Sequence, residues 1–135
     1  MTYDELAKKA INARELAYAP YSNFLVGAAL LDINGNVHVG ANIENAAYSP
    51  TLCAERTAIA TAIMTGAKDF TAIAVAGWHN NASTGNAFPC GVCRQVLAEF
   101  CHKDFVVLVV EASGKYTAHK FGDILPHRFG PDNLT

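Results

Sequence analysis

The chain has 135 residues, of which 51% are hydrophobic and 16% are charged, so its composition favours one domain, residues 1–135, around a buried core. The formal net charge of −2 provides no basic surface for DNA or RNA, and we expect no nucleic-acid partner. The first residues predict an amphipathic helix and contain no long apolar stretch. We therefore expect no signal peptide, no membrane partner and a cytoplasmic location.

The first predicted element is a helix over residues 2–19, followed by a β-hairpin. Thr2 and Glu5 form a capping box, apolar residues recur at helical spacing, and Pro20 ends the pattern. Residues 24–32 form an apolar, strand-like run, and Asn34-Gly35 is a hairpin turn into residues 37–40. The first two strands are therefore expected to be antiparallel, with a loop over residues 42–49.

Helices and strands alternate in the remainder of the chain. Helices are predicted over residues 53–65, which Gly66 ends, and over residues 91–101. Strands are predicted over residues 70–78, 105–110 and 116–120, with a surface loop at 80–87 and a turn of helix within 122–129. The continuous apolar run 105–110 is typical of a strand buried on both faces. This order predicts an α/β fold: a three-layer α/β/α arrangement with a mixed five-stranded sheet, in which the central helix-linked strands run parallel.

Two cysteine motifs indicate a catalytic metal site. Cys53-Ala54-Glu55 places a soft metal ligand two residues before a carboxylate, and Cys90 and Cys93 form a Cys-x-x-Cys pair preceded by proline. Three protein ligands leave the fourth position of a tetrahedral zinc ion for water, which ionises there with a pKa of about 7. We expect Cys53, Cys90 and Cys93 to bind Zn²⁺ and Glu55, off the metal, to carry protons. Four cysteines without a secretion signal favour reduced thiols over disulfides.

Both motifs lie at the starts of predicted helices, where free backbone N–H groups and the helix dipole favour thiolates. Three thiolates on Zn²⁺ leave a net charge of −1, which weakens the pull of the metal on its water. Arg56 is placed to donate to the sulfurs and withdraw charge, and Arg94 and Gln95 are expected to support it.

Other interpretations of these cysteines and of Glu55 remain open from the residues alone. A Cys-x-x-Cys pair also occurs in zinc knuckles and in redox pairs. A knuckle needs a fourth ligand, and Cys101 lies two turns along the same predicted helix, where we expect it to be a small buried hydrophobic residue. A redox pair leaves Cys53-Ala54-Glu55 unexplained. Glu55 itself would suit the first turn of any helix, and none of the five histidines fits the ligand pattern.

Five segments, in order along the chain, carry a family resemblance. They are Tyr21-Ser22-x-Phe24-x-Val26-Gly27-Ala28-Ala29, Asn42-Ile43-Glu44-Asn45-Ala46, Cys53-Ala54-Glu55-Arg56, Pro89-Cys90-Gly91-x-Cys93-Arg94-Gln95 and Leu125-Pro126-x-x-Phe129. Over nearly its whole length the chain resembles the small, zinc-dependent, all-cysteine cytidine deaminases, which are homotetramers. The motifs with Cys or His at the first position are the signature of zinc nucleobase deaminases. The resemblance implies a cytidine deaminase-like fold, a Zn²⁺ cofactor and a homotetramer.

The resemblance also implies the reaction. It is the hydrolytic deamination of cytidine and 2'-deoxycytidine to uridine and 2'-deoxyuridine with release of ammonia, a step of pyrimidine salvage. A zinc-bound hydroxide attacks the ring carbon that bears the amine, and Glu55 shuttles the protons, acting first as base and then as acid.

The family's substrate contacts correspond to residues spread along this chain. Asn42 and Glu44 match a ribose-binding pair, Ala54 offers backbone groups to the base edge, and Phe24 packs on the pyrimidine. Tyr48 and Phe129 match residues that complete the pocket of a neighbouring subunit. Without the family match, Asn42 would be interpreted as a loop residue and Phe24 as core.

The chain departs from the family pattern in one segment and leaves two other functions open. Residues 78–88 are longer and more polar than the usual connection, and Phe88 stands where a small residue is common. Deaminases of nucleoside antibiotics of the blasticidin type share the zinc motifs but lack Asn-x-Glu-Asn and the arginine after Cys-Ala-Glu, so Asn42, Glu44 and Arg56 favour cytidine. A non-catalytic zinc-stabilised module would instead have four protein ligands. Free cytosine gives Asn42 and Glu44 no sugar to hold, and polynucleotide editing needs a basic, aromatic surface.

Overall fold

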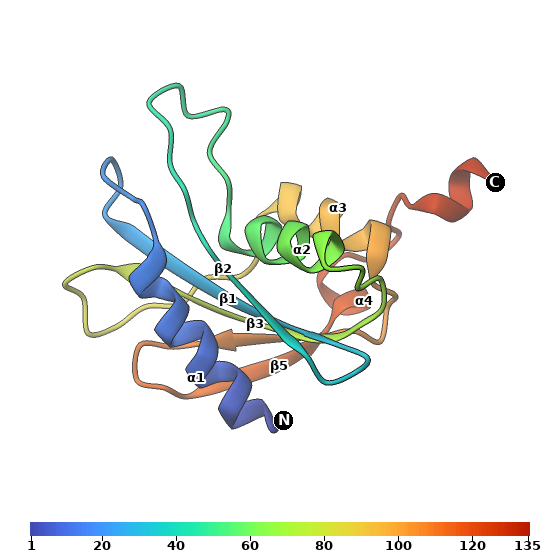
Figure 1. The fold of residues 1–135 in the computed structure, drawn as a ribbon, viewed down its shortest axis with the longest axis horizontal. Coiled ribbons are helices and arrows are strands. Elements are labelled where there is room, and N and C mark those ends of the chain that lie inside the picture. Colours follow the sequence, from blue (N-terminus) through green and yellow to red (C-terminus); the bar gives the residue numbers. More distant parts are fainter.

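The computed structural model describes residues 1–135, which form a five-stranded sheet in the order β2-β1-β3-β4-β5 (Figure 1). The strands are β1 (Phe24–Asp32), β2 (Val37–Ala41), β3 (Phe70–His79), β4 (Val106–Val110) and β5 (Tyr116–Lys120). The helices are α1 (Tyr3–Ala13), α2 (Ala54–Met64), α3 (Gly91–Phe100) and α4 (Phe121–Ile124), with 3-10 turns η1 (Arg14–Leu16) and η2 (Pro131–Leu134). None of these helices has the length and hydrophobicity that a bilayer crossing requires.

The first helix begins where the sequence predicts and ends earlier. The Thr2 hydroxyl accepts a hydrogen bond from the Glu5 N–H at 3.1 Å, which caps α1. The prediction that this helix continues to residue 19 is wrong, because Ala17 is extended. The Tyr18 N–H donates to the Asn42 carbonyl at 2.9 Å, and the Glu44 N–H donates to the Tyr18 carbonyl at 2.8 Å. These long-range hydrogen bonds replace the last turns of the predicted helix.

The mixed sheet is confirmed, with its directions set by the connections. β1 is antiparallel to both β2 and β3, and β4 is antiparallel to β5. β3 and β4 run parallel and are linked through α3, as predicted for the central helix-linked strands. The turn of helix predicted within residues 122–129, with Pro126 or Gly130-Pro131 as its end, covers Phe121–Ile124 and stops before Pro126, because Leu125 leaves the helical conformation.

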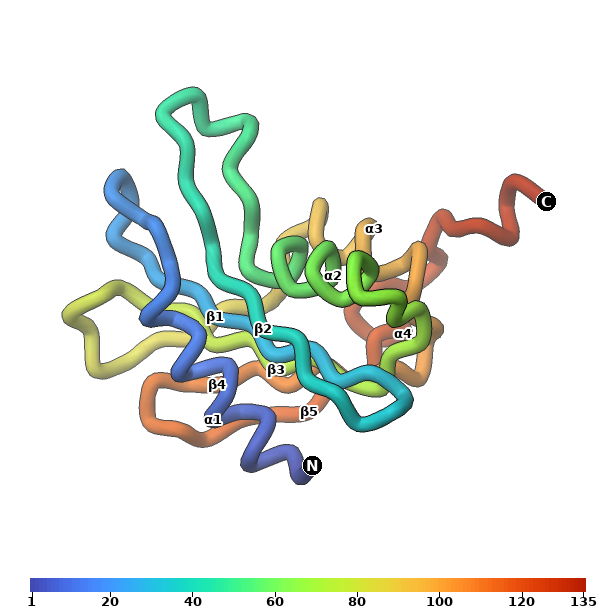
Figure 2. The backbone as a smooth tube through the Cα atoms, viewed as in Figure 1, coloured from blue at the N-terminus to red at the C-terminus, as the bar shows by residue number.

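Helices cover both faces of the sheet, which confirms the three-layer α/β/α fold. Figures 1 and 2 show α1 on one face and α2 with α3 on the other. Side chains of β1 alternate accordingly: Ala28 and Leu30 belong to the core on the α2 and α3 face, whereas Ala29 and Leu31 belong to the core on the α1 face. The central strands are buried on both sides, which explains the continuous apolar run of β4.

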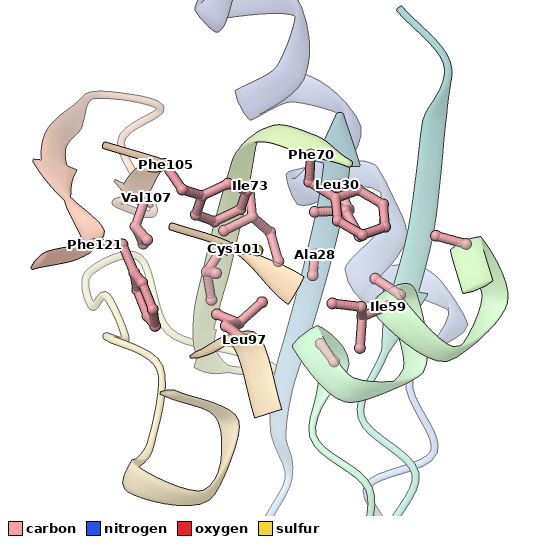
Figure 3. Close-up of a cluster of buried hydrophobic side chains, with 14 of the residues drawn as sticks. Ala28, Leu30, Ile59, Phe70, Ile73, Leu97, Cys101, Phe105, Val107 and Phe121 are labelled. Atoms are coloured by element: carbon pink, nitrogen blue, oxygen red, sulfur yellow. The ribbon is translucent and has the colours of Figure 1, made fainter. Parts of the chain in front are cut away.

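The larger core lies beneath the two helices that carry the cysteine motifs (Figure 3). Phe121, from the C-terminal part of the chain, is fully buried there and meets Phe105 edge to face, with ring centroids 6.2 Å apart. Burying a side chain of this size stabilises the fold by roughly 1.5–3 kcal/mol. The segment after β5 is therefore part of the core that supports α3.

The N-terminal turns of α2 lie directly on β2. A Cβ atom at Gly40 would be 2.4 Å from the Ala58 nitrogen and 2.5 Å from the Ala54 carbonyl oxygen. Only glycine allows this approach of helix backbone to strand backbone. The close contact fixes the position of Cys53 and Glu55 relative to the sheet.

Candidate active site

Two helix N-termini bring three cysteines together. Cys53 is the N-cap of α2, Cys90 is the N-cap of α3, and Cys93 lies in the first turn of α3. The Cys90 sulfur accepts a hydrogen bond from the Cys93 N–H at 3.4 Å. All four cysteines of the chain are free thiols. The helix ends place unpaired backbone N–H groups and positive dipole ends at the sulfurs, which favours thiolates there.

The spacing of the three sulfurs fits zinc. The Sγ atoms of Cys53 and Cys90 are 3.8 Å apart, those of Cys90 and Cys93 are 3.4 Å apart, and all three lie within 4.8 Å of one another. Sulfurs at 2.3 Å from a tetrahedral zinc ion are roughly 3.8 Å apart. Cys101 is outside this group: it is buried in the core as the C-cap of α3. Three ligands are thus available, and a closed four-cysteine site is excluded.

Two of the thiols differ strongly in acidity. The pKa of Cys53 is lowered to about 5, chiefly because its sulfur interacts with the Cys93 thiol and also because Arg56 lies beside it. The same interaction and burial raise the pKa of Cys93. Cys53 is therefore the more acidic of these two thiols. A divalent cation would favour thiolates at all three positions.

Arg56 is the cation at the sulfur cluster, as the sequence predicts. Its Nη2 donates to the Thr51 carbonyl at 3.0 Å and to the Cys53 sulfur at 3.6 Å. Interaction with Cys53, and secondarily with Cys93, raises the pKa of the Arg56 guanidinium. Its Nε is buried without a hydrogen-bond partner. A buried donor without an acceptor is costly, and fully deprotonated sulfurs would make this cation better compensated.

Glu55 lies in the first turn of α2, and its side chain is almost completely buried, with the residue 4% exposed. Burial raises the pKa of the Glu55 carboxyl to about 7, with a smaller contribution from the charge on Cys53. A carboxyl with a pKa near neutrality can accept and return a proton at the same pH. A cation bound by the sulfurs would lower the pKa of the Glu55 carboxyl and so favour its ionised form.

A cavity of about 390 Å³ joins these groups to the predicted substrate residues. Its lining includes Cys53, Glu55 and Cys90. Phe24, Asn42 and Glu44 also line it, so the structure brings together the catalytic, metal-binding and sugar-binding residues predicted from the sequence. The remaining lining residues are Ser22, Val26, Thr51, Leu52, Val75, Ala87 and Phe88.

Asn42 and Glu44 are held in place by hydrogen bonds to their own chain. The Asn42 side chain accepts from the Val26 N–H at 2.9 Å and donates to the Phe24 carbonyl at 2.8 Å. Glu44 accepts from the backbone N–H groups of Tyr21 and Ser22 at 2.9 and 3.1 Å and from the Ser22 hydroxyl. Burial raises the pKa of Glu44, but these hydrogen bonds outweigh it and lower the pKa overall. Glu44 therefore enters the cavity ionised.

Other predicted residues lie outside the cavity. Tyr48 is 71% exposed, with its ring edge-on to Tyr21 at 6.1 Å, and Phe129 is 57% exposed near the C-terminus. Ala54 is fully buried at the start of α2, beside the cavity residues Cys53 and Glu55. Neither aromatic ring lines the cavity that contains Glu55, although Tyr48 lines an adjoining cavity that shares Ser22, Glu44 and Thr51 with it.

Arg94 and Gln95 do not reach the sulfurs, which corrects the expectation that they support Arg56 there. Arg94 donates from Nε to the Pro89 carbonyl at 2.7 Å and from Nη1 to the Ile124 carbonyl at 2.6 Å. Gln95 donates to the Phe129 carbonyl at 2.9 Å. Both side chains bind backbone carbonyls around α3, and Arg94 thereby ties the segment before Cys90 to the C-terminal part of the chain.

Ser22, Ala87 and Phe88 are among the cavity residues that were given no role from the sequence alone. Ser22 lies in the quoted segment before Phe24, and its hydroxyl and N–H orient Glu44. Ala87 and Phe88 directly precede Pro89 and line the cavity. The departure of Phe88 from the family pattern was the available signal for a role at the site.

Comparison with known proteins agrees with this geometry. The family model described as the cytidine and deoxycytidylate deaminase zinc-binding region matches residues 1–109. A cytidine deaminase of Halalkalibacterium halodurans is 47% identical over 130 residues, covering 96% of this chain and 95% of that protein. One from Sporosarcina psychrophila is 42% identical over 135 residues, covering 100% and 96%.

Solved structures give the same result. A crystal structure of cytidine deaminase from Burkholderia pseudomallei superposes with a TM-score of 0.87 at 44% identity, covering 96% of this chain and 100% of that one. Cytidine deaminase from Mycobacterium tuberculosis superposes with a TM-score of 0.81 at 35% identity, covering 96% and 98%.

Proposed function

Because this chain belongs to the cytidine and deoxycytidylate deaminase family, we propose that it catalyses the hydrolytic deamination of cytidine and 2'-deoxycytidine, a reaction of pyrimidine salvage. The observation that carries this proposal is one cavity whose lining contains Glu55 and two of the three clustered thiols together with Asn42 and Glu44. A nucleoside has a base with a hydrolysable amine and a sugar with hydroxyls, which match these two groups of side chains.

Cys53, Cys90 and Cys93 would hold the zinc ion, and Arg56 would balance the negative charge of their sulfurs. When bound, zinc lowers the pKa of a coordinated water to about 7, which supplies a nucleophile at neutral pH. A carboxylate oxygen of Glu55 would accept a proton from the attacking water as the water oxygen bonds to the reacting carbon, and would pass this proton to the ring nitrogen next to that carbon. Glu55 then assists proton transfer to the amine, which leaves as ammonia while the carbonyl of uridine forms.

The other cavity residues bind and orient the nucleoside. Glu44, ionised and held by Ser22 and Tyr21, accepts hydrogen bonds from ribose hydroxyls, and Asn42 supports the same sugar. Phe24 packs on the pyrimidine ring, and the Ala54 backbone at the start of α2 faces the base edge. Holding base and sugar together positions the reacting carbon toward the Glu55 end.

The proposal extends to the assembly. We propose one catalytic domain over residues 1–135 that forms a homotetramer, in which Tyr48 and Phe129 reach a neighbour's pocket. The large exposed fractions of both aromatic rings support this role. Mass measurement by light scattering tests the tetramer, and a chain that is monomeric and active at all dilutions would remove both residues from the pocket. Three ligand thiols require a reducing compartment, which supports a cytoplasmic location.

The experiment that tests the activity follows the ultraviolet band of cytidine together with ammonia release. We expect both signals from the zinc-loaded protein, and loss of both after treatment with a zinc chelator, with recovery on adding zinc. Absence of ammonia release from cytidine and deoxycytidine by zinc-loaded protein would refute the proposed function. Release from a nucleoside antibiotic alone would identify the rival deaminase.

A further inference from the structure

We propose that Phe88 is a specificity-determining wall of the cavity, which excludes cytidines that carry an alkyl group on the exocyclic amine or on the adjacent ring carbon C5. The inference rests on the proposed function and names a residue and a substrate restriction for it. It starts from a placement: Phe88 lines the cavity together with Phe24, Glu55 and Cys90, and it is 44% exposed. A large aromatic ring that is half exposed within a pocket contributes a surface for ligands rather than core packing.

The position of Phe88 along the chain assigns it to the reacting end of the cavity. Cys90 follows two residues later, so the two Cα atoms are at most about 7 Å apart. Glu55 and Cys53 line the same cavity. A base whose reacting carbon points toward Glu55 has its amine and its C5 edge nearest to this wall. The ring of Phe88 therefore borders the atoms on which additional alkyl groups would sit.

The backbone around Phe88 is fixed. Pro89, which follows it, is fully buried and restricts residue 88 to extended conformations. The Pro89 carbonyl accepts a hydrogen bond from Arg94 Nε at 2.7 Å, which ties it to α3. This segment therefore has little freedom to move aside for a larger base.

The side chain of Phe88 is supported from the edge of the sheet. Its ring packs against the His119 imidazole of β5, with centroids 5.0 Å apart and planes at 59°. His119 Nε2 in turn forms a hydrogen bond with the Thr117 hydroxyl at 2.8 Å. Ring pairs of this kind favour one geometry, so His119 acts as a positioning residue for Phe88.

The part of the cavity wall that packs on β3 at Gly77 cannot make room for a larger base. A Cβ atom at Gly77 would lie 2.9 Å from the Ala87 Cβ, 3.1 Å from the Val26 Cγ2 and 3.2 Å from the Phe24 ring. These three side chains therefore pack directly on the backbone of β3 and have no space behind them. Phe88 is the wall whose size decides how large a base the cavity accepts.

The test compares substrate selectivity rather than activity alone. The kcat/KM values for cytidine, N4-methylcytidine and 5-methylcytidine are measured for the zinc-loaded wild-type protein and for Phe88→Ala. A methyl group in a closed pocket changes selectivity by about 10- to 200-fold. We expect Phe88→Ala to reduce the preference for cytidine over each methylated nucleoside at least about tenfold, and Phe88→Tyr to retain it. An unchanged preference in Phe88→Ala would overturn the inference.

His119 provides an independent readout. We expect His119→Ala to raise KM for cytidine about two- to tenfold with little change in kcat, and to relax the selectivity in the same direction as Phe88→Ala. His119→Phe restores a ring against Phe88 and is expected to restore the selectivity. If His119→Ala lost the selectivity and His119→Phe did not restore it, the positioning role of His119 would be contradicted.

Failure of this inference is distinguishable from failure of the proposed function. If the wild-type protein deaminates cytidine and Phe88→Ala keeps its selectivity, only the role of Phe88 is wrong. If the wild-type protein releases no ammonia from cytidine, the proposed function is wrong, and calorimetric titration with uridine and 5-methyluridine then tests the role of Phe88 by itself. A smaller preference for uridine over 5-methyluridine in Phe88→Ala than in the wild type would support this role, and an equal preference would overturn it.

Discussion

The Nη2 of Arg56 donates to the Cys53 sulfur at 3.6 Å, so a permanent cation lies against one of the three candidate zinc ligands. We expect Arg56→Gln to reduce kcat/KM or zinc affinity about 10- to 100-fold, because uncompensated thiolate charge weakens the pull of the metal on its water. Turnover and bound zinc are measured together. Arg56→Lys retains the positive charge but loses the planar guanidinium donors, so its turnover and zinc content should lie between those of the wild type and Arg56→Gln. Wild-type turnover in Arg56→Gln would show that the cation is not needed.

Glu55→Gln tests the proton carrier. The amide has nearly the same size and cannot accept the proton, so we expect turnover to fall at least about 10²-fold while the zinc content and melting temperature are retained. Steady-state kinetics, metal analysis and thermal unfolding provide the three measurements. Normal turnover in this variant would remove Glu55 from the mechanism.

The cysteines offer a matched pair of substitutions. We expect Cys53→Ala to lose stoichiometric zinc, because two thiols bind the metal much more weakly than three. Cys101→Ala should keep one zinc per chain and lose only stability, since Cys101 is buried in the core and lies outside the sulfur cluster. Zinc analysis after dialysis distinguishes the two. Stoichiometric zinc in Cys53→Ala would mean that another side chain completes the site.

The interactions of the Asp32 carboxyl, at the end of β1, determine how the free energy of unfolding depends on pH. Asp32 accepts from the N–H groups of Asn34 and Asn36 and pairs with His38 Nε2 at 2.9 Å. The hydrogen bond from His38 is the main cause of the lowered pKa of Asp32; burial raises the pKa, and the two backbone N–H groups lower it further. A carboxyl whose pKa is lower in the folded state stabilises the protein above its unfolded pKa of about 3.9, and this contribution disappears as pH falls through the folded value.

We therefore expect the free energy of unfolding to fall as pH decreases below about 4, and to fall less steeply in Asp32→Asn. Urea denaturation at a series of pH values measures this. Asp104→Asn is the control, because Asp104 forms only an exposed pair with Lys120 at 3.9 Å, and such pairs contribute little. Equal pH dependence in the wild type and Asp32→Asn would contradict the assignment.

The close packing of α2 on β2 at Gly40 leads to a prediction about stability and about the position of Glu55. Adding a methyl group would force α2 away from β2, since its Cβ would meet backbone atoms of Ala54 and Ala58. We expect Gly40→Ala to lose about 3 kcal/mol or more of stability and to displace Glu55. Gly91→Ala is the matched control for stability, because nothing lies within 4 Å of its added Cβ. Denaturant unfolding measures the stability of both variants. Equal stability of Gly40→Ala and Gly91→Ala would show that α2 can move away from β2 without loss of stability.

Local sequence patterns predicted most of the helices and strands, because turn residues and apolar runs act on the chain near them and do not depend on contacts with distant segments. The Asn34-Gly35 turn and the apolar runs around it fix the hairpin, and β1 and β5 have the predicted bounds. The end of α1 could not be predicted, because hydrogen bonds of Tyr18 to Asn42 and Glu44 decide it. The roles of Arg94 and Gln95 depend on where the C-terminal segment crosses α3, which no local pattern records.

The residues alone determined the donor chemistry of this protein, because three thiols and a carboxylate in two short motifs suit few metals and few reactions. The tertiary structure decided which groups share one cavity and how each is held. Asn42 is held by hydrogen bonds to the backbone of β1, and Glu44 by hydrogen bonds from Ser22 and Tyr21. The ring of Phe88 packs against His119. The reason is physical: ligand identity is a property of side chains, whereas the size and shape of a cavity arise from backbone contacts between segments far apart in the chain.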